Sequence, residues 1–484
     1  SGGYLSTNLT VDSTFENQNS DKWLKEGSLV NNLNMNINEK FNLNISSALQ
    51  TSKDYIQQVS PNDDLSYASS LTSSMEINGY NLNKIDDRLM LNISTYQINQ
   101  NNEDNKTTPT ILPYLTYNTG NYELKKQIKY NNNYEFYNIF RDTPTDIHSK
   151  SQRKISSTIS LNKEAINYGS KINFRANIYN QLFDTENKKI NGNFQSNTYF
   201  RSFPILGLDL STPFRFKTDK NNLIYTPKIS FVVSPGLSNS EKISNEDSSV
   251  NSYTIDNNNS LNRFTGTDKL DNSKRLNLSF NINNDSLSAA FLQSYEFTDN
   301  SNFHYSQGNE KKLSDFLGIF SVTKNSLKTN YDFRYDSNES YLKSQKLTLG
   351  YNSYIGNFNF NYLDQNSKVD EIIVSDLETL NYQFKSKKIN KFSEITYFGL
   401  YDLKNEINTE SGISYSYFDE CFGVNIDFKR DSYSDDDLKP QDILTVMFSF
   451  KNLGAYKSTN LAVSENEKQN IKWEDSTVDN DLFN

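Results

Sequence analysis

Apolar and polar side chains alternate along much of this chain with a period of two residues. In the stretch 171–178, Ile172, Phe174, Ala176 and Ile178 are separated by Asn173, Arg175 and Asn177, and the same pattern returns at residues 41–45, 276–282, 357–362 and 424–429. Successive side chains of a β-strand point to opposite faces, so this pattern predicts strands with one apolar and one polar face. Stretches with the period of a helix are essentially absent, which predicts an all-β protein.

The lengths of the alternating segments favour a barrel that crosses a membrane. About 24 such segments can be placed, most of them near the ~9–11 residues that a tilted strand needs to cross a bilayer. From residue 222 onward, long polar loops are expected at 234–273, 299–314, 336–340, 365–374 and 431–440, with tight turns between them near residues 283–285, 324–326, 352–353 and 419–420. Long extracellular loops alternating with short periplasmic turns are typical of outer-membrane barrels. We therefore expect a large antiparallel transmembrane β-barrel of about 24–26 strands.

The composition is compatible with this fold. Only 35% of the residues are hydrophobic, yet the chain has 31 Tyr and 31 Phe, and its mean hydropathy is −0.75. A membrane barrel satisfies its backbone groups between strands and needs only one apolar face per strand. We expect the lipid-facing side chains to include Ile172, Phe174, Ile178, Phe280, Ile282, Val424, Ile426 and Phe428, and Asn277 and Asn425 to face the lumen. A soluble β-solenoid or adhesin is the alternative, but it predicts a fixed repeat with recurring Gly, and neither is found.

Several function classes are disfavoured by the residue inventory. The net charge of −10 argues against nucleic-acid binding. Two His and one Cys are too few for a multi-ligand zinc site or a disulfide scaffold. His148 and His304 stand alone in polar stretches without the neighbours of a catalytic triad. The acidic run 434–437 lacks the Gly and distal Glu of an EF-hand loop and is interpreted as a solvated loop. We therefore predict that the protein is not an enzyme and needs no metal or other cofactor.

The sequence predicts one barrel domain followed by a tail. No stretch approaches the ~18 apolar residues of a membrane helix. Residues 1–454 are predicted to form the barrel, with a truncated start as an alternative, and residues 455–484 a polar, acidic tail. The chain begins Ser-Gly-Gly, without Met or an apolar leader segment, so we expect a mature form or a fragment.

Several segments resemble, in the same order, the LptD (OstA/Imp) family of lipopolysaccharide-assembly outer-membrane proteins, particularly its alphaproteobacterial branch. The most specific are residues 243–248 (ISNEDS) and 260–268 (SLNRFTGTD), and the others are 201–210 (RSFPILGLDL), 225–228 (YTPK), 332–336 (DFRYD), 419–422 (DECF) and 450–454 (FKNLG). The resemblance extends over about residues 145–454 and is weak before them. The N-terminal periplasmic jellyroll domain of the family has no counterpart in this sequence, and we expect it to be absent.

The resemblance implies a translocon in the bacterial outer membrane. Such a protein receives lipopolysaccharide from a periplasmic bridge through the N-terminal domain and inserts it into the outer leaflet. The implied partners are lipopolysaccharide, a plug lipoprotein of the LptE type in the lumen, and the lipids of the outer membrane, with no nucleic acid. The alternative is a porin or receptor-type barrel for solute uptake. A receptor of that type carries a plug domain within its own chain, for which no compact non-strand segment is large enough.

The resemblance also implies two sets of site residues. A lateral seam between the first and last strands is expected to involve Leu5, Leu9, Val11, Ile443, Thr445 and Met447. Cys421, alone in its tight turn, has no partner within this chain and is either an inert buried thiol or half of a bridge. A turn flanked by Asp419 and Glu420 is a poor place to bury a thiol, and in the family cysteines at this turn pair with the N-terminal domain. The resemblance therefore implies a disulfide from Cys421 to that missing domain.

Overall fold

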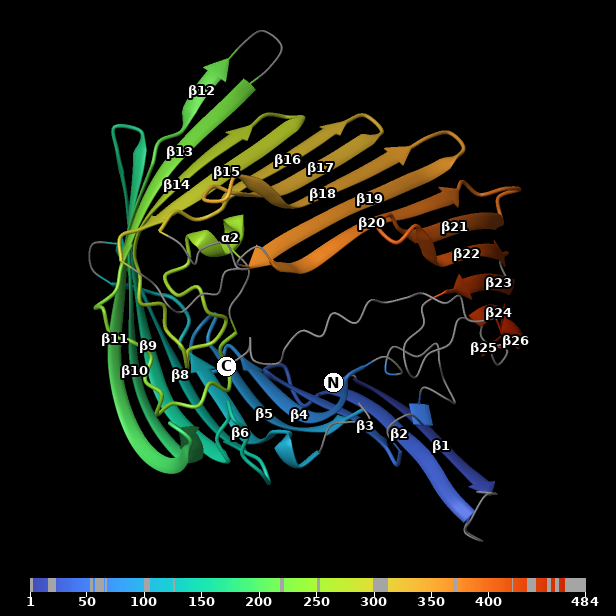
Figure 1. The fold of residues 1–484 in the computed structure, drawn as a ribbon, viewed down its shortest axis with the longest axis horizontal. Coiled ribbons are helices and arrows are strands. Elements are labelled where there is room, and N and C mark those ends of the chain that lie inside the picture. The colour runs from blue at the N-terminus through green and yellow to red at the C-terminus, as the bar shows by residue number, and fades with distance from the viewer. Residues whose placement is uncertain are drawn as a thin grey trace. The chain divides into compact units, whose positions relative to one another are not determined.

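The computed structural model shows antiparallel strands hydrogen-bonded into a sheet, with 26 strands among the described residues (Figure 1). Helical structure is limited to short segments such as α2 (Ile255–Asn258) and the 3-10 turn η2 (Asn105–Thr107). The all-β antiparallel prediction is confirmed. The structure describes residues 3–15, 23–52, 55–56, 65, 68–99, 105–124, 127–217, 222–249, 253–298, 312–369, 372–419, 421–432, 441–450, 454–457 and 461–465.

The strands belong to two compact units. The first unit consists of Ser1–Thr212, Lys228–Leu278 and Ser294–Lys312, and the second of Pro213–Pro227, Ser279–Gln293 and Leu313–Asn484.

Strands of the first unit pair with their neighbours in chain order. They are β1 (Gly3–Phe15), β2 (Trp23–Asn36), β3 (Phe41–Gln50), β4 (Ser70–Tyr80), β5 (Arg88–Ile98), β6 (Thr110–Asn118), β7 (Tyr122–Leu124), β8 (Ile128–Phe140), β9 (Ser151–Asn167), β10 (Ser170–Ile190) and β11 (Asn193–Ser211). Three further strands have residues in both units, namely β13 (Asn222–Val233), β14 (Lys274–Asn283) and β15 (Leu287–Glu296).

The second unit repeats this up-and-down order. The strands that lie wholly in it are β12 (Phe214–Lys217), β16 (Phe316–Lys324), β17 (Leu327–Asp336), β18 (Tyr341–Asn352), β19 (Gly356–Val369), β20 (Ile372–Ser386), β21 (Ser393–Asp402), β22 (Ile407–Phe418), β23 (Phe422–Asp431), β24 (Gln441–Phe450), β25 (Gly454–Lys457) and β26 (Leu461–Glu465). The last two lie in the segment that the sequence assigns to the tail, and both pair with β24.

The connections agree with the predicted alternation except at two of the expected long loops. The first, at residues 336–340, is short, because β17 ends at Asp336 and β18 begins at Tyr341. Long connections follow β13, β15 and β23, and short ones follow β14, β16, β18 and β22. The second expected long loop, at residues 365–374, is wrong, because β19 runs to Val369 and β20 begins at Ile372. The polar residues Asn366 and Ser367 belong to the sheet, where they pair with Asp376 and Ser375. A polar stretch therefore does not mark a loop when the backbone ladder continues through it.

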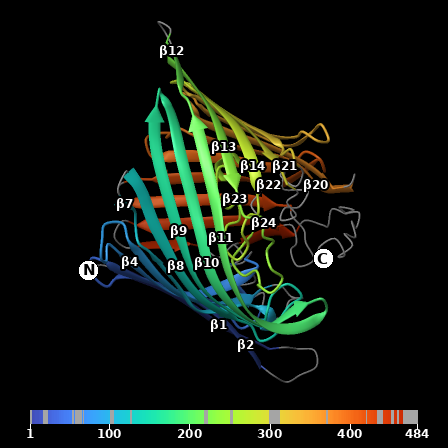
Figure 2. The same cartoon turned by 90° about the vertical axis from the view of Figure 1, so that its left-hand side faces the viewer.

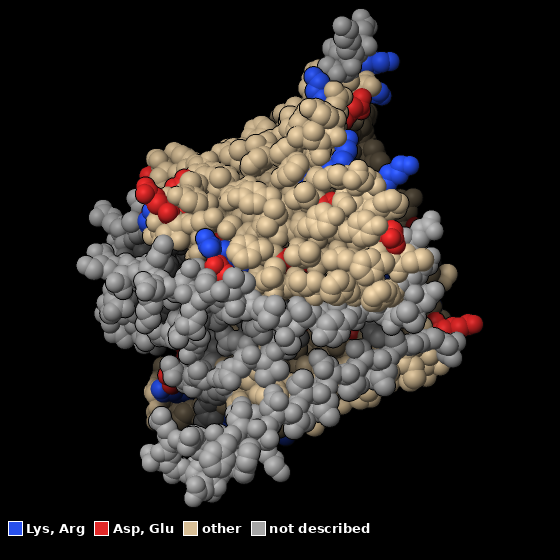
Figure 3. Space-filling view, turned by 90° about the vertical axis from the view of Figure 1, so that its right-hand side faces the viewer, with Lys and Arg blue, Asp and Glu red and all other residues tan. Residues whose placement is uncertain are grey.

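The apolar face of the strands is exposed, as expected for a face that contacts lipid. Exposed fractions reach 44% for Phe174 and 38% for Ile426, whereas the polar alternate positions of β8–β11 are largely buried. One side of the molecule shows a broad area with few charges, and the Lys, Arg, Asp and Glu side chains gather mostly near its edges (Figure 3). No helix among the described residues is long and apolar enough to cross a membrane.

Asn277, which we expected to face the lumen, is not exposed to solvent there. Its side chain is only 1% exposed, and its Nδ2 donates to the Asn258 carbonyl oxygen at 3.0 Å. Asn277 is therefore covered by the chain itself, so the expectation that this position tolerates a large charged side chain does not fit the structure. Asn425 on β23 is half-buried and accepts a hydrogen bond from the Ser416 hydroxyl.

Two adjacent residues of β23 provide a test of the two faces. Replacing the exposed Ile426 with Arg should lower the free energy of unfolding by ~2–4 kcal/mol near the middle of a bilayer, because the lipid face cannot solvate a charge. Replacing Asn425 with Arg places the charge on the opposite face beside Asp427 and should cost much less. Refolding into lipid vesicles under a urea gradient measures both. Equal losses at the two positions would contradict the assignment of the faces.

Candidate functional site

Residues 234–273 join β13 to β14, and those that the structure describes, 234–249 and 253–273, lie on the concave side of the sheet in the first unit (Figures 1 and 2). We call this segment the inner loop, and the strand face that it covers the inward face. The described residues of the inner loop contact alternate positions of β8–β11, which are the polar positions of the two-residue pattern. A connection that the sequence predicts as an external loop is therefore folded back onto the wall.

Lys154 of β9 is the centre of the contact. Its side chain is fully buried, and its Nζ lies 2.8 Å from Asp247 Oδ2, 2.9 Å from Asp268 Oδ1 and 3.3 Å from Glu135 Oε2. Asp247 and Asp268 belong to the inner loop, so one lysine of the wall binds two parts of the loop. Removing one member of such a buried cluster typically costs ~3–5 kcal/mol, because the remaining charge is left without a partner.

Further hydrogen bonds extend this cluster along the wall. The Tyr137 hydroxyl donates to Asp268 at 2.8 Å, and Gln152 Nε2 donates to the Ser244 carbonyl oxygen at 2.7 Å. Gln152 Oε1 in turn accepts from the Ser244 backbone N–H at 2.7 Å. Gln152 thus binds the loop backbone at Ser244 as both donor and acceptor, which fixes the register of the loop against β9.

Arginines hold the loop at three further points. Arg201 of β11 donates to the carbonyl oxygens of Thr267 and Asp268 at 2.8 and 2.9 Å. Arg141 forms an ion pair of 2.5 Å with Glu246. Arg175 of β10 donates to the Asn259 carbonyl oxygen at 2.6 Å. A guanidinium group offers several donors in a fixed plane, which suits the carbonyl groups of an irregular segment.

A second buried ion cluster fastens the end of the inner loop. Arg263 makes two hydrogen bonds to Asp271, of 2.6 and 3.1 Å, and a third to Glu296 of 3.2 Å. Arg275 of β14 also contacts Asp271, at 2.9 Å. All four side chains are almost completely buried. The charges of the two arginines are therefore balanced by the two carboxylates within the cluster.

Close apolar packing completes the contact. The buried cluster joins three strands to two loop side chains and consists of Tyr179, Phe203, Ile205, Val232, Leu261 and Leu270. Gly266 allows the closest approach within the loop, because a Cβ atom there would lie 2.3 Å from the backbone oxygen of Asp247. The inner loop is therefore packed on the wall like part of a protein core, with its charges compensated.

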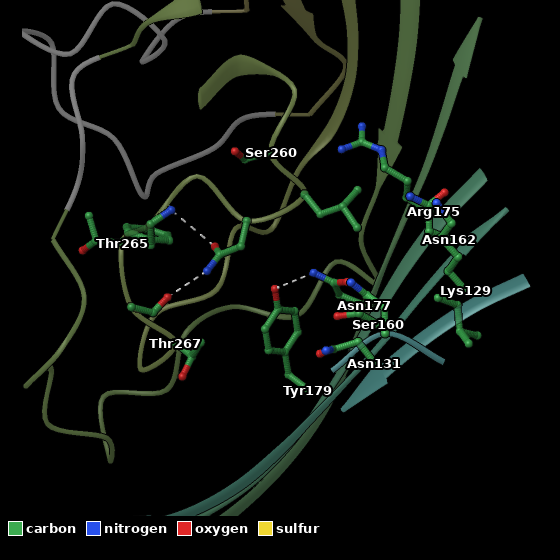
Figure 4. A pocket seen from close by; sticks show the side chains of 16 residues that line it. Lys129, Asn131, Ser160, Asn162, Arg175, Asn177, Tyr179, Ser260, Thr265 and Thr267 are labelled. Carbon is green, nitrogen blue, oxygen red and sulfur yellow. Dashed lines mark hydrogen bonds between the residues drawn. The ribbon is translucent and has the colours of Figure 1, made fainter. Parts of the chain in front are cut away.

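An open polar groove remains beside the loop, between residues 260–267 and strands β8–β10 (Figure 4). Its volume is about 700 Å³. The wall contributes Lys129, Asn131, Ser160, Asn162, Arg175 and Asn177 to its lining, and the loop contributes Ser260, Thr265 and Thr267. The groove offers many hydrogen-bonding groups and two cations, and none of its described lining residues is acidic.

Burial alters the titration of loop residues at the Lys154 cluster. Burial raises the pKa of Asp268 to about 6, since three carboxylates share a single ammonium group. Burial acts in the same direction on Asp247, but Lys154 and hydrogen bonds outweigh it and hold the pKa of that carboxyl below its usual value. Burial also lowers the pKa of His148, whose Nδ1 lies 3.6 Å from Glu246.

The site residues predicted from the sequence lie away from this contact. Cys421 is an exposed, free cysteine in the turn between β22 and β23, and its backbone N–H donates to Asp419. The alternative of a buried thiol is therefore wrong. On β24, the residues Ile443, Thr445 and Met447 lie on the face that carries Asn425 and Asp427 of β23. Both edges of β24 are paired, one with β23 and the other with β25 and β26.

The other residues that the sequence singled out lie on β1, beside the inner loop, or outside the described part of the chain. The seam residues Leu5, Leu9 and Val11 belong to β1, which pairs with β2. The side chain of His148, predicted to be an isolated loop residue, lies beside the Arg141–Glu246 ion pair. His304 and the acidic run 434–437 lie outside the described residues. Within the described part of the chain, no group of three His, Cys, Asp or Glu is placed to hold a metal ion.

Sequence reasoning missed the ion clusters, although two signals pointed to them. The two inner-loop segments 243–248 and 260–268 were the most specific motifs, and they contain Asp247, Arg263 and Asp268. In addition, Lys154, Arg201 and Arg275 stand at inward positions of strands whose other inward residues are mostly uncharged. A long charged side chain at such a position requires a partner, but the sequence does not say which one.

An antiparallel sheet with an exposed apolar face and a polar inward face defines an outer-membrane β-barrel protein. Residues 29–413 match the model of one protein family, described as LptD, LPS transport system D. The chain therefore belongs to the LptD family, whose members are lipopolysaccharide transport proteins and not enzymes. This confirms the resemblance that the motifs indicated.

Other comparisons add less. A porin mutant from Rh. blastica is 9% identical, with a TM-score of 0.23 over 62% of this chain and 94% of the porin. The siderophore receptor PirA from Acinetobacter baumannii is also 9% identical, with a TM-score of 0.32 over 93% of this chain and 74% of the receptor. No curated protein matches the chain in sequence.

The raised pKa of Asp268 predicts that docking of the inner loop depends on pH. The docked carboxyl binds its proton more tightly than a free one, so its contribution is complete below about pH 4 and is lost as the pH rises through about 6. The loss should amount to about 2–3 kcal/mol. The lowered pKa of His148 acts in the opposite direction, because its contribution is lost as the pH falls through 6.5 and below.

Hydrogen exchange of the inner-loop amides at pH 4.5 and 7.5 measures this dependence. In a His148→Gln background, which removes the opposing contribution, protection of the loop should decrease as the pH rises. Adding Asp268→Asn, which resembles the protonated carboxyl, should remove most of that decrease. The same pH dependence with and without Asp268 would show that another group is responsible.

Proposed function

We propose that this protein is a translocon that inserts lipopolysaccharide into the outer leaflet of the bacterial outer membrane. Membership of a lipopolysaccharide transport family supports this role. The observation that carries the proposal is the inner loop, which covers the inward face of β8–β11. One buried ion cluster fastens it to β8 and β9, and a second fastens it to β14 and β15. A wall blocked in this way does not suit straight passage of a large amphiphile, whereas it suits a route that leaves sideways.

The exit in this proposal is a lateral seam between the first strand and the closing strands of the barrel. On the first strand it involves Leu5, Leu9 and Val11, and on the closing side Ile443, Thr445 and Met447 of β24. The outer edge of β24 pairs with β25 and β26, which are only four and five residues long. Short strands contribute few ladder hydrogen bonds and little side-chain contact, so an edge of this kind opens at low cost.

Two further partners belong to the proposal. A plug lipoprotein of the LptE type is proposed to occupy the lumen, and a periplasmic lipopolysaccharide bridge to deliver the substrate through an N-terminal domain. Transport of a solute by a porin-type channel is the competing function. Ion conductance through planar bilayers distinguishes the two, since a translocon closed by its inner loop should conduct poorly.

Crosslinking of the seam tests the exit. Cysteines are introduced on β1 at Leu9 and on the closing side at Thr445 or, in a second variant, at Ser464 of β26, all in a Cys421→Ser background. The pair that forms a disulfide should block the arrival of pulse-labelled lipopolysaccharide at the cell surface while barrel assembly proceeds normally, and reductant should restore export. A pair within β22 and β23, which are neighbours in the sheet, is the control. Normal export with a fully crosslinked seam would exclude the lateral route.

Cys421 is proposed to form a disulfide with the N-terminal periplasmic domain of the family. The thiol is exposed in a short turn, and an exposed thiol in an oxidising compartment is rarely left free. Non-reducing electrophoresis of the protein from whole outer membranes, compared with Cys421→Ser, should show a difference in mobility that reductant abolishes. Identical mobility, together with complete alkylation of Cys421 in the wild type, would contradict the bridge.

A further inference from the structure

The hairpin formed by β12 and the start of β13 projects from the second unit. β12 pairs with residues 222–225 of β13, and we call these two segments the end hairpin. It extends past the turn that joins β14 to β15 in the same unit (Figure 1). All four residues of β12 are exposed, so neither face of this strand is covered. The end hairpin therefore offers side chains on two faces to whatever lies at this end of the unit.

One face of the end hairpin is aromatic and continues the apolar surface of the sheet. The ring of Tyr225 stacks on Phe214 with 6.3 Å between the centroids, and on Phe280 of β14 with 6.2 Å. Phe280 belongs to the exposed apolar face that is expected to contact lipid. Phe216 lies on the same face as Phe214, because it is two residues further along the strand, and it is 57% exposed. The aromatic row therefore leads from the lipid-facing surface towards the tip of the end hairpin.

The opposite face of the end hairpin carries two cations, Arg215 and Lys217. Arg215 Nη2 donates to Asn222 Oδ1 at 3.3 Å, and neither cation forms an ion pair within the part of the chain that the structure describes. Cations at the opposite end of the same unit are paired. Lys343 lies 3.2 Å from Asp315, and Lys429 lies 3.4 Å from Glu410. The charges of the end hairpin therefore remain available to another molecule.

Other connections at this end of the second unit are also basic. Because consecutive strands are antiparallel, the turns after β14, β16, β18, β20 and β22 lie at the same end as the end hairpin. The described acidic residues of these turns are Asp285 and Asp419, and Glu394 nearby is paired with Lys385. The exposed cations in or beside the turns are Lys324, Lys328, Lys387, Lys388 and Lys391. In a chain with a net charge of −10, this end is locally positive.

We propose that the end hairpin binds anionic phospholipid at the periplasmic surface of the outer membrane. The short connections of an outer-membrane barrel lie on the periplasmic side. Aromatic rings suit the level of the lipid headgroups, and Arg and Lys form charge-assisted hydrogen bonds to phosphate. Basic segments beside a bilayer are attracted to anionic lipid. Aromatic and basic faces on one projecting strand therefore fit a lipid surface, with the rings towards the hydrocarbon and the cations among the phosphates.

Lipid retention tests the role of the cations. The full chain in detergent is mixed with equal amounts of phosphatidylglycerol and phosphatidylcholine of the same acyl chains, and native mass spectrometry counts the lipids retained. The wild type should prefer phosphatidylglycerol. Replacing Arg215 and Lys217 with Gln should lower this preference about fivefold for each cation removed. The control replaces Lys404 and Lys429 with Gln, which removes the same charge at the opposite end of the unit and should leave the preference unchanged.

Equal retention of the two lipids by the wild type overturns the proposal, and so does an equal loss of preference in the hairpin variant and the control. The position of the aromatic face is measured separately. Phe216→Trp, in a chain whose Trp23 and Trp473 are replaced with Phe, should show fluorescence that is quenched in bilayers of brominated phospholipid. Unquenched fluorescence would show that the end hairpin lies away from lipid and would overturn the proposal. Neither measurement involves export, so either result leaves the proposed transport function to its own test.

Discussion

A strand in contact with lipid has to satisfy its backbone N–H and C=O groups on neighbouring strands, because hydrocarbon offers no hydrogen bonds. The antiparallel ladders that run through both units meet this requirement, and most other features follow from it. Once the backbone is satisfied by pairing, one face of each strand is free to be apolar and the other to be polar. Only 35% of the residues are hydrophobic. This is enough, because only the face that carries exposed side chains such as Ile426 and Phe174 has to be apolar.

The same arrangement determines the character of the inward face. In a soluble protein the buried face of a sheet is apolar, whereas here the buried positions under the inner loop include Lys154, Gln152 and Arg201. These groups are buried at acceptable cost because each has charged or hydrogen-bonding partners on the loop. The inner loop therefore depends on the polar wall, and the wall requires the loop wherever its long charged side chains would otherwise remain unpaired.

Next to this closed region, the groove along Lys129, Asn162 and Arg175 keeps polar groups that the chain does not use fully. One part of this face is therefore fastened by the inner loop, and the other forms an open polar groove. Both parts lie on β8, β9 and β10, at different positions along these strands. The tight packing of Gly266 against Asp247 holds two parts of the inner loop together beside the groove.

The sequence by itself determined the class of the fold and the orientation of the faces. Alternation with a period of two is a local property, and so is the choice between a strand and a helix, which is why Ile172, Phe280 and Ile426 were assigned correctly to the apolar face. Family motifs were also readable, because they are contiguous. The polar stretch at residues 365–374 was misread as a loop, since only pairing with another strand shows that its backbone is in the sheet.

The tertiary structure alone decided where residues 234–273 go and which charges meet. Lys154 and Asp268 are more than one hundred residues apart, and Arg201 contacts carbonyl groups that no sequence pattern marks. The two-residue pattern predicts that Asn277 is an ordinary lumen residue, but the backbone of Asn258 covers it. Such contacts depend on the path of an irregular segment in space, and that path is set by the sum of many long-range interactions rather than by the residues of the segment alone.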